Sequence, residues 1–218
     1  MNMLKYLIWD FNGTILDDVD LCLSILNNQL TKYHLPNVSK DHYLDIFTFP
    51  IVDYYLAVGL NDDIKPFEQL ANEFIEQYDQ RHKKETVVYP QVLELLKKYQ
   101  KLGFKQIVLS ASKQDILVDQ LRYFNVDQYF DEILGINDIY AHSKLELGLN
   151  WIKEQNINLD EALMIGDSIH DLEVGLSMGV NVVLVGQGHT SMSRLLAVSA
   201  NSFNDFCDVD EYVMNNFD

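Results

Sequence analysis

The stretch LIWDFNGTILDD, residues 7–18, decides the fold of this chain because it joins a buried strand to a polar turn. Residues 4–9 form a short apolar run, which is typical of a strand that is covered on both faces of a sheet. Asp10 follows the run directly, and Gly13 lies in the turn beyond it. The strand therefore delivers a carboxylate into a turn, whereas the next polar side chain, Asn12, is an amide that cannot ionise.

Further apolar runs are expected to complete the sheet. Three strong runs cover residues 104–110, 161–167 and 180–186, and a weaker run covers residues 132–136. Apolar residues three or four positions apart fill the gaps between the runs, which is the spacing of amphipathic helices. The predicted helices cover residues 90–103, 113–124 and 144–155. Alternating strands and helices predict an α/β fold with a Rossmann-like core of three layers, in which helices cover both faces of a parallel sheet.

Residues 18–86 interrupt this alternation, because they carry helical patterns and no strand candidate. The four helical patterns are residues 19–34, 39–47, 51–59 and 64–84. A helical insertion after the first strand is the simplest account. We therefore expect a small all-helical cap domain at residues 18–86, inserted into an α/β core of residues 1–17 and 87–218.

The composition argues against several classes of protein. The chain has 218 residues and a formal net charge of −17, whereas broad nucleic-acid binding needs a basic surface. The two cysteines, Cys22 and Cys207, lie far apart, which argues against a disulfide scaffold or a zinc site. There is no signal-like N-terminal segment and no apolar run of about 18 residues. We expect a cytoplasmic protein without membrane contact, and a monomer or a dimer.

Polar side chains gather where the predicted strands end, and ligands of open α/β sheets bind at that edge. The residues concerned are Asp10, Asn12, Ser110, Ser112, Asp167, Asp171 and Lys144, the last opening the helix after the weaker strand. Each of them taken alone could be a helix cap, a turn residue or a solvated lysine. Together, two carboxylates from different strands suit Mg²⁺, and the hydroxyl, the lysine and the turn amides suit phosphate oxygens.

Four segments resemble, in order, the motifs of the haloacid dehalogenase superfamily: DFNGT at residue 10, VLSAS at residue 108, Lys144, and GDSIHD at residue 166. The helical insert is similar to the small cap of the phosphoglycolate-phosphatase-like members. The resemblance covers essentially the whole chain. It implies a Mg²⁺-dependent phosphatase that acts on a small phosphorylated metabolite through an aspartyl phosphate.

The resemblance also assigns roles to individual residues. Asp10 would be the nucleophile, and Asn12, Ser110 and Lys144 would complete the catalytic set. The implied phosphate-binding residues are Asp10, Gly13, Thr14, Ser110, Ala111 and Lys144. Mg²⁺ would be held by Asp10, Asp167, the backbone carbonyl of Asn12, and Asp171 through water; Asp171 could instead orient Lys144.

Asn12 departs from the pattern, because phosphatases of the superfamily normally carry a second Asp there as the general acid and base. Its loss affects proton transfer, which contributes roughly 10²–10⁴-fold in rate. Three hypotheses follow: a slow phosphatase or one with a good leaving group, a phosphatase in which His170 or His189 replaces the acid, and a phospho-ligand-binding or regulatory protein. His170 is otherwise expected on a solvent-facing helix, and His189 in a loop.

Two other branches of the superfamily also lack the second Asp. Dehalogenases work without Mg²⁺ and carry an arginine near the nucleophile, whereas Arg81, Arg122 and Arg194 all lie far from it in sequence. Phosphonate-cleaving members use a cap lysine, and the expected cap offers Lys32, Lys40 and Lys65 without a recognisable context. Neither activity is expected.

The expected cap also carries an aromatic stretch, residues 45–60, that is nearly free of cations. Packing of its rings into the cap's own core explains most of them. If some of the rings face the site, a substrate with many negative charges is disfavoured.

Overall fold

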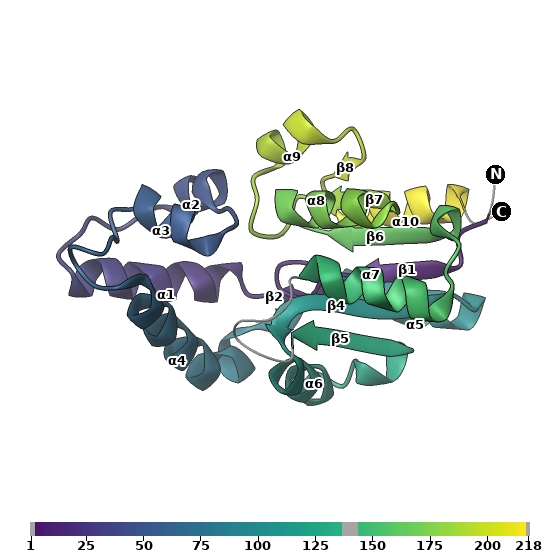
Figure 1. Cartoon of the computed structure of the whole chain (residues 1–218), viewed down its shortest axis with the longest axis horizontal. Helices are drawn as coiled ribbons and strands as arrows, with labels where there is room; N and C mark the ends of the chain where they lie inside the picture. The colour runs from purple at the N-terminus through teal and green to yellow at the C-terminus, as the bar shows by residue number, and fades with distance from the viewer. Residues whose placement is uncertain (1–2, 137–143, 217–218) are drawn as a thin grey trace.

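A six-stranded parallel sheet forms the centre of the computed structural model, which describes residues 3–136 and 144–216. The strand order is β5-β4-β1-β6-β7-β8, and Figure 1 shows the sheet with its covering helices. The strands are β1 (Tyr6–Trp9), β4 (Lys105–Lys113), β5 (Glu132–Ile136), β6 (Ala162–Gly166), β7 (Asn181–Val185) and β8 (Ser202–Phe203). Because Trp9 pairs with Val108 on one side and Ile165 on the other, residue 10 emerges between two strands.

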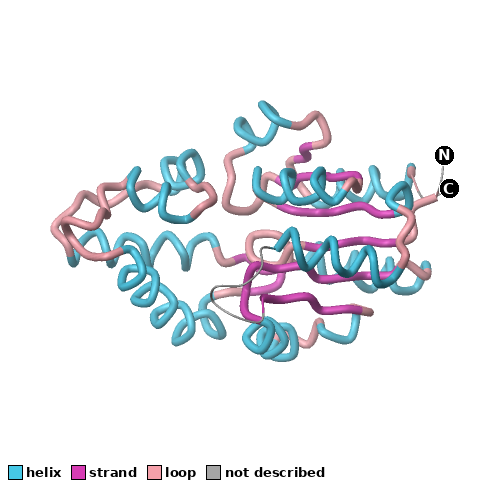
Figure 2. Tube along the Cα trace, viewed as in Figure 1, coloured by secondary structure: helices cyan, strands magenta, loops and turns pink. Residues whose placement is uncertain are grey.

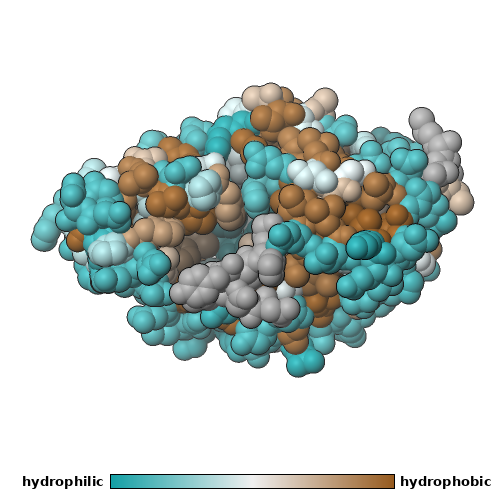
Figure 3. Space-filling model, in the orientation of Figure 1, coloured by the Kyte–Doolittle hydropathy of each residue, from teal (hydrophilic) through white to brown (hydrophobic). Residues whose placement is uncertain are grey.

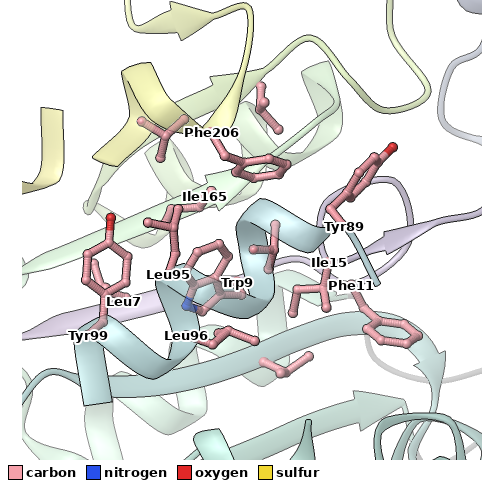
Figure 4. Close-up of a cluster of buried hydrophobic side chains, with 14 of the residues drawn as sticks. Leu7, Trp9, Phe11, Ile15, Tyr89, Leu95, Leu96, Tyr99, Ile165 and Phe206 are labelled. Carbon is pink, nitrogen blue, oxygen red and sulfur yellow. The ribbon is translucent and has the colours of Figure 1, made fainter. Parts of the chain in front are cut away.

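Helices cover both faces of the sheet and bury a hydrophobic cluster on each. One face carries α5 (Pro90–Leu102), α6 (Gln114–Tyr123) and α10 (Phe206–Asn215). Figure 4 shows side chains of α5 and Phe206 of α10 in the cluster around Trp9. The other face carries α7 (Lys144–Gln155) and α8 (Ile169–Met178). Burial on both faces explains why the strand sequences are apolar throughout. The predicted three-layer α/β fold is confirmed.

The other elements of the α/β core are short. They are the single-turn helices η1 (Asp127–Tyr129) and η2 (Leu159–Glu161), the helix α9 (Met192–Val198), and the antiparallel pair β2 (Leu16–Asp17) and β3 (Val87–Val88). All five predicted sheet strands are present, including the weaker one, which is the edge strand β5. The sequence patterns missed β2, β3 and β8, because two-residue strands are too short to show a period.

Four helices precede β3 and lie beyond the carboxyl ends of the strands, as Figures 1 and 2 show. They are α1 (Val19–Lys32), α2 (Lys40–Ile46), α3 (Ile51–Ala57) and α4 (Phe67–Glu85). Tyr43, Tyr54 and Tyr55 pack with buried leucines into a hydrophobic cluster of this segment's own. The antiparallel pairing of β2 with β3 holds the two chain connections between this helical segment and the sheet side by side. All of residues 18–86 are described, and they contain no strand; the exact domain boundaries stay a prediction.

Apolar surface is visible over helices α7 to α9 and over α2 and α3 in Figure 3. Exposed leucines on the first group of helices are Leu149, Leu176 and Leu196. Within the described part of the chain, none of the helices combines the length and apolar character that a membrane span requires.

Candidate active site

The predicted site residues lie at the carboxyl ends of β1, β4 and β6, which point toward the helical segment in Figure 1. Asp10 follows β1 directly, Ser110 lies within β4, and Asp167 follows β6. All three are buried. The parallel register therefore brings residues that are far apart in sequence to one edge of the sheet.

Lys144 lies between two of the carboxylates. Its ammonium group donates to Asp10 Oδ1 and to Asp171 Oδ1, the latter at 2.6 Å. Lys144 and Asp171 expose 3% or less of their surface, so this is a buried ion-pair triad rather than a surface salt bridge. A lysine at the start of α7 thus reaches the strand end of β1, as the sequence predicts.

Asp171 uses its two carboxylate oxygens for different purposes. Oδ1 accepts from Lys144, while Oδ2 accepts from the backbone N–H of Ser168 at 3.0 Å and from its hydroxyl at 2.6 Å. The Ser168 hydroxyl oxygen in turn accepts from the Asp171 N–H, which completes a capping box at the start of α8. One residue therefore combines helix capping with a place in the site.

Asp167 is enclosed by the turn after β1 and the loop after β7. The Thr14 hydroxyl donates to Oδ1 at 3.1 Å, and the His189 backbone N–H donates to Oδ2 at 2.6 Å. Gly13 has a left-handed φ of 78°, and a Cβ there would lie 2.5 Å from Asp167 Oδ2. Glycine is therefore required at residue 13 both for its backbone conformation and for the close approach of the carboxylate.

The carboxylates of Asp10, Asp167 and Asp171 offer oxygens that all lie within 4.8 Å of one another. Burial and the charge of Asp171 raise the pKa of Asp10 to about 8, despite Lys144. Burial also raises the pKa of Asp167 to about 6, although the His189 charge opposes it. Burial would raise the pKa of Asp171, but Lys144 and the hydrogen bonds donated to the Asp171 carboxylate outweigh this effect and lower the pKa. One ammonium group therefore does not neutralise the three carboxylates.

The donor set fits a hard divalent cation. Carboxylate oxygens at the end of parallel strands are the ligands that Mg²⁺ prefers, and Mg²⁺ needs one or two of them together with water and substrate oxygens. Burial, together with the neighbouring carboxylates, raises the pKa of Asp10 and of Asp167, so a bound divalent cation would favour the ionised form of both. The described residues thus provide a site that a Mg²⁺ ion would suit.

The Asn12 side chain makes three hydrogen bonds. Its Nδ2 donates to Asp18 Oδ2 and to the Tyr78 hydroxyl oxygen, each at 2.8 Å. Its Oδ1 accepts from the Ser112 hydroxyl at 3.1 Å. Both amide hydrogens and the carbonyl oxygen are therefore engaged, and the amide joins β4 to the helical segment.

The two histidines occupy different surroundings. His189 is buried, its Nε2 lies 3.1 Å from Asp18 Oδ1, and its Nδ1 lies 2.8 Å from the Tyr43 hydroxyl. Burial would lower the pKa of His189, but the Asp18 carboxylate outweighs it and raises the pKa to about 9. His170 is half-buried and stacks on Phe49 with ring centroids 4.6 Å apart, and burial lowers its pKa. The sequence predicts a solvent-facing His170, whereas the Phe49 ring covers part of it. His189 lies in a loop, as predicted, but its side chain is buried.

Ser110 and Ala111 are neighbours in the second half of β4. The buried Ser110 hydroxyl accepts from the Ser112 N–H at 3.1 Å, and Ala111 is exposed within β4. Among the hydrogen bonds of the described residues, none joins Ser110 to Asp10. Both residues lie in the carboxyl-terminal half of β4, and the roles that the resemblance gives them stay predictions.

The arginines and cap lysines are engaged elsewhere. Arg81 pairs with Glu85, and Arg194 donates to the Leu44 and Phe47 carbonyls. Arg122 lies 4.0 Å from Asp127. Lys32 and Lys65 both contact Glu73, while Lys40 pairs with Asp20. These contacts give no support to the dehalogenase or phosphonate-cleaving alternatives.

Asp18, Tyr43 and Tyr78 are site residues that the sequence patterns did not reveal. Asp18 immediately precedes a helix, which is the usual position of an N-cap, so its sequence context gave no signal of another role. The tyrosines lie in amphipathic helices, where an aromatic residue is normally part of a core. Their hydroxyl groups reach Asp18 and His189 only because the chain folds back on itself.

Comparison with known proteins places the chain in a family. Residues 7–185 match the family model described as haloacid dehalogenase-like hydrolase. The chain is 22% identical over 183 residues to the pyrophosphatase PpaX of Halalkalibacterium halodurans, and the match covers 82% of each protein. It is 26% identical over 186 residues to a phosphoglycolate phosphatase of Vibrio vulnificus, covering 81% of each.

Solved structures show the same fold. A predicted phosphatase from Clostridium acetobutylicum superimposes with a TM-score of 0.83 at 19% identity, over 98% of this chain and 100% of that one. The protein tyrosine kinase A of Mycobacterium tuberculosis gives a TM-score of 0.81 at 19% identity, over 98% of this chain and 99% of the other. The family match spans most of the chain and includes Asp10, Lys144 and Asp167. This chain is therefore an enzyme of the haloacid dehalogenase-like hydrolase family.

Proposed function

We propose that this enzyme is a Mg²⁺-dependent phosphatase of small phosphorylated metabolites, with Asp10 as the nucleophile. The observation that carries the proposal is the convergence of Asp10, Asp167 and Asp171, the first and last of which contact the buried ammonium group of Lys144. Relatives named as phosphatases and pyrophosphatases support the same reaction class. The high negative net charge does not oppose it, since the local field of cation and lysine decides whether an anion binds.

The proposed cation would be held by Asp10, Asp167 and the Asn12 carbonyl, with Asp171 as a further ligand through water. Bound there, Mg²⁺ would compensate the charge of the carboxylates and of the transferring phosphoryl group. Lys144 lies against Asp10 and favours its ionised, nucleophilic form. In phosphoryl transfer the protein contributes mainly positioning and charge compensation, and this site contains residues for both.

The reaction would proceed in two displacements. A carboxylate oxygen of Asp10 forms a bond to phosphorus while the bond from phosphorus to the leaving oxygen breaks. Water then attacks the same phosphorus, the bond to Asp10 breaks, and inorganic phosphate leaves with the Asp10 carboxylate regenerated. The leaving oxygen takes up a proton after the first step unless its anion is stable, and the attacking water loses one in the second.

Proton transfer is the step that Asn12 would compromise. An amide has no proton to exchange at neutral pH, and both hydrogens of Asn12 Nδ2 are already donated. We infer that good leaving groups, such as aryl oxides or the phosphate of an anhydride, are cleaved faster than alkoxides. A catalytically impaired phospho-ligand-binding or regulatory role is the second candidate function, and the same Asn12 observation favours it.

Hydrolysis of aryl phosphates with graded leaving groups, with and without Mg²⁺, tests the first candidate. We expect Mg²⁺-dependent turnover whose rate falls steeply as the leaving group becomes more basic, and no turnover by Asp10→Asn. Asp20→Asn is the matched control, since Asp20 is exposed on α1 and its salt bridge within the described part of the chain is with Lys40. Activity that survives Asp10→Asn would refute the nucleophile assignment.

A panel that includes phosphoglycolate and pyrophosphate should follow, because relatives carry these names. We expect the anhydride to be the better substrate of the two, since phosphate leaves without needing a proton at neutral pH. If every compound binds and none turns over, the second candidate function replaces the first.

A further inference from the structure

Asp18 is the most heavily hydrogen-bonded carboxylate among the described residues outside the acidic cluster, and no role has been assigned to it. It is buried, exposing 1% of its surface. Five groups lie in donor positions around its two oxygens: the Gly13 N–H at 3.0 Å, Asn12 Nδ2 at 2.8 Å, the Tyr78 hydroxyl at 2.8 Å, His189 Nε2 at 3.1 Å and the Cys22 thiol at 3.7 Å.

This carboxylate does not cap the helix that it precedes. Asp18 is the N-cap residue of α1, yet its side chain accepts no hydrogen bond from the first turn. It turns instead toward the loop after β1 and accepts from two consecutive residues of that loop, Asn12 and Gly13. The usual structural role of an aspartate at this position is therefore absent, and the contacts with the loop that follows Asp10 take its place.

The hydrogen bonds also explain why residue 12 is an amide. An ionised carboxylate only accepts hydrogen bonds, so the Asp18 oxygens require donors. Asn12 Nδ2 lies 2.8 Å from Asp18 Oδ2 and supplies one. An aspartate at residue 12 would place a second acceptor at that distance and leave the Asp18 oxygen without this donor.

A metal ion is a weaker explanation of the same cluster. Asp18, Cys22 and His189 offer ligand atoms within 4.8 Å of one another. However, a carboxylate has about four lone-pair sites, and five groups already surround Asp18. Its neighbours therefore satisfy it without a cation.

We propose that Asp18 is a positioning residue for the loop that carries Asp10, and that Asn12 and Asp18 form a matched amide–carboxylate pair. A carboxylate at residue 12 is compatible with this site only when residue 18 becomes an amide. The pair also ties the helical segment to the loop, because Tyr78 of α4 contacts both members. The pairing itself depends only on the geometry, while its effect on turnover rests on the proposed phosphatase function.

A double-mutant cycle tests the pair with four proteins: the wild type, Asn12→Asp, Asp18→Asn, and the reciprocal exchange of both. In the exchange, the new amide at residue 18 donates to the new carboxylate at residue 12, and the Ser112 and Tyr78 hydroxyls donate to the same carboxylate. Asp20→Asn controls for loss of one carboxylate from α1. The readouts are Tm, which does not depend on activity, and kcat and KM with an aryl phosphate and Mg²⁺.

We expect each single variant to lose roughly 3–12 °C in Tm, the shift that corresponds to a lost buried hydrogen bond to a charged group in a chain of this size. We expect kcat to fall by about 10- to 100-fold with a smaller change in KM, because the loop rather than substrate binding is disturbed. The exchange should recover most of both losses. Asp20→Asn should match the wild type.

Additive Tm losses in the exchanged protein would overturn the pairing, and so would a stable, more active Asn12→Asp single variant. A Tm cycle that shows recovery, together with unchanged kcat in Asp18→Asn, would overturn the positioning role alone. If no protein of the set hydrolyses the substrate, the phosphatase proposal and the positioning role fail together, and the Tm cycle still decides whether the pair exists.

Discussion

Replacement of Lys144 by methionine would test the electrostatics of the site, because the ammonium group is buried between two carboxylates. Methionine keeps much of the length of the side chain and removes the charge. Asp171 is then left as a buried anion without its counter-charge, and Asp10 loses the cation that favours its ionised form. Removing one partner of a buried ion pair costs about 3–5 kcal/mol, and a chain of this size loses about 2–4 °C in Tm per kcal/mol, so we expect Tm to fall by roughly 6–20 °C at pH 8.

The loss should depend on pH and on Mg²⁺. The pKa of Asp10 is already raised to about 8 with the lysine present, and removal of the lysine raises it further. At about pH 5 Asp10 is protonated in the wild type and in the variant alike, so the Tm difference should be smaller there than at about pH 8, where only the wild type keeps part of Asp10 ionised beside the lysine. Mg²⁺ should raise the Tm of Lys144→Met more than that of the wild type, because a cation replaces the missing charge.

Differential scanning calorimetry at about pH 5 and about pH 8, with and without Mg²⁺, provides the measurement. Lys153→Met is the matched control, since Lys153 is exposed on the same helix, α7. Equal Tm values of Lys144→Met and Lys153→Met at the higher pH, or an equal loss of Tm at both pH values, would contradict this role of the buried ammonium group.

Three further predictions concern the turn, the pH dependence and the aromatic loop. Gly13→Ala should abolish activity. Gly103 has a similar φ of 87°, but nothing lies within 4 Å of the Cβ that alanine would add there, so Gly103→Ala should lower the free energy of unfolding by only about 1 kcal/mol in a denaturant titration and keep full activity. Equal effects of the two substitutions would contradict the steric argument. Burial and nearby carboxylates raise the folded-state pKa of Asp10 from 3.8 to about 8. At His189 burial would lower the pKa, but the charge of Asp18 outweighs it and raises the pKa from 6.5 to about 9. The folded state therefore binds more protons than the unfolded state between these values. The stability that protonated Asp10 contributes is therefore lost as the pH rises from 3.8 to about 8, and that of protonated His189 is lost between pH 6.5 and about 9. Tm of the metal-free protein should fall from about pH 5 to about pH 9, and a rising Tm would contradict these shifts. The Phe49 ring stacks on His170 at the edge of a cavity of about 30 Å³. Phe49→Ala should raise KM for aryl phosphates with little change in Tm, and an unchanged KM would exclude substrate contact by this ring.

Much of the fold was predictable because burial on both faces makes each long strand apolar, as in residues 161–167. The β2–β3 pair and β8 were not, since each of these strands has two residues and shows no period. The position of the helical segment followed from the loss of strand patterns after residue 18. Its packing onto the strand ends depends on contacts between distant residues, which no local pattern records.

The acidic cluster was predictable for a related reason. Parallel strands end at one edge, so Asp10 and Asp167 had to lie near each other, and Lys144 opens a helix at that edge. The environment of Asn12 was not predictable, because Asp18 resembles a helix cap in sequence and Tyr78 is 66 residues away. The amide, which the motif alone marks as a missing acid, is in the structure a hydrogen-bond donor to a neighbouring carboxylate.

Asp10 is proposed to carry the phosphoryl group between the two displacements, and chemical trapping of that group tests this role. The enzyme would be mixed with an aryl phosphate and Mg²⁺, quenched in acid within one turnover, and mapped by peptide mass spectrometry. We expect one added phosphoryl group on the peptide that contains Asp10, absent from Asp10→Asn and present in Asp20→Asn. Release of phosphate at the wild-type rate with no phosphoryl group on Asp10 at any quench time would contradict it.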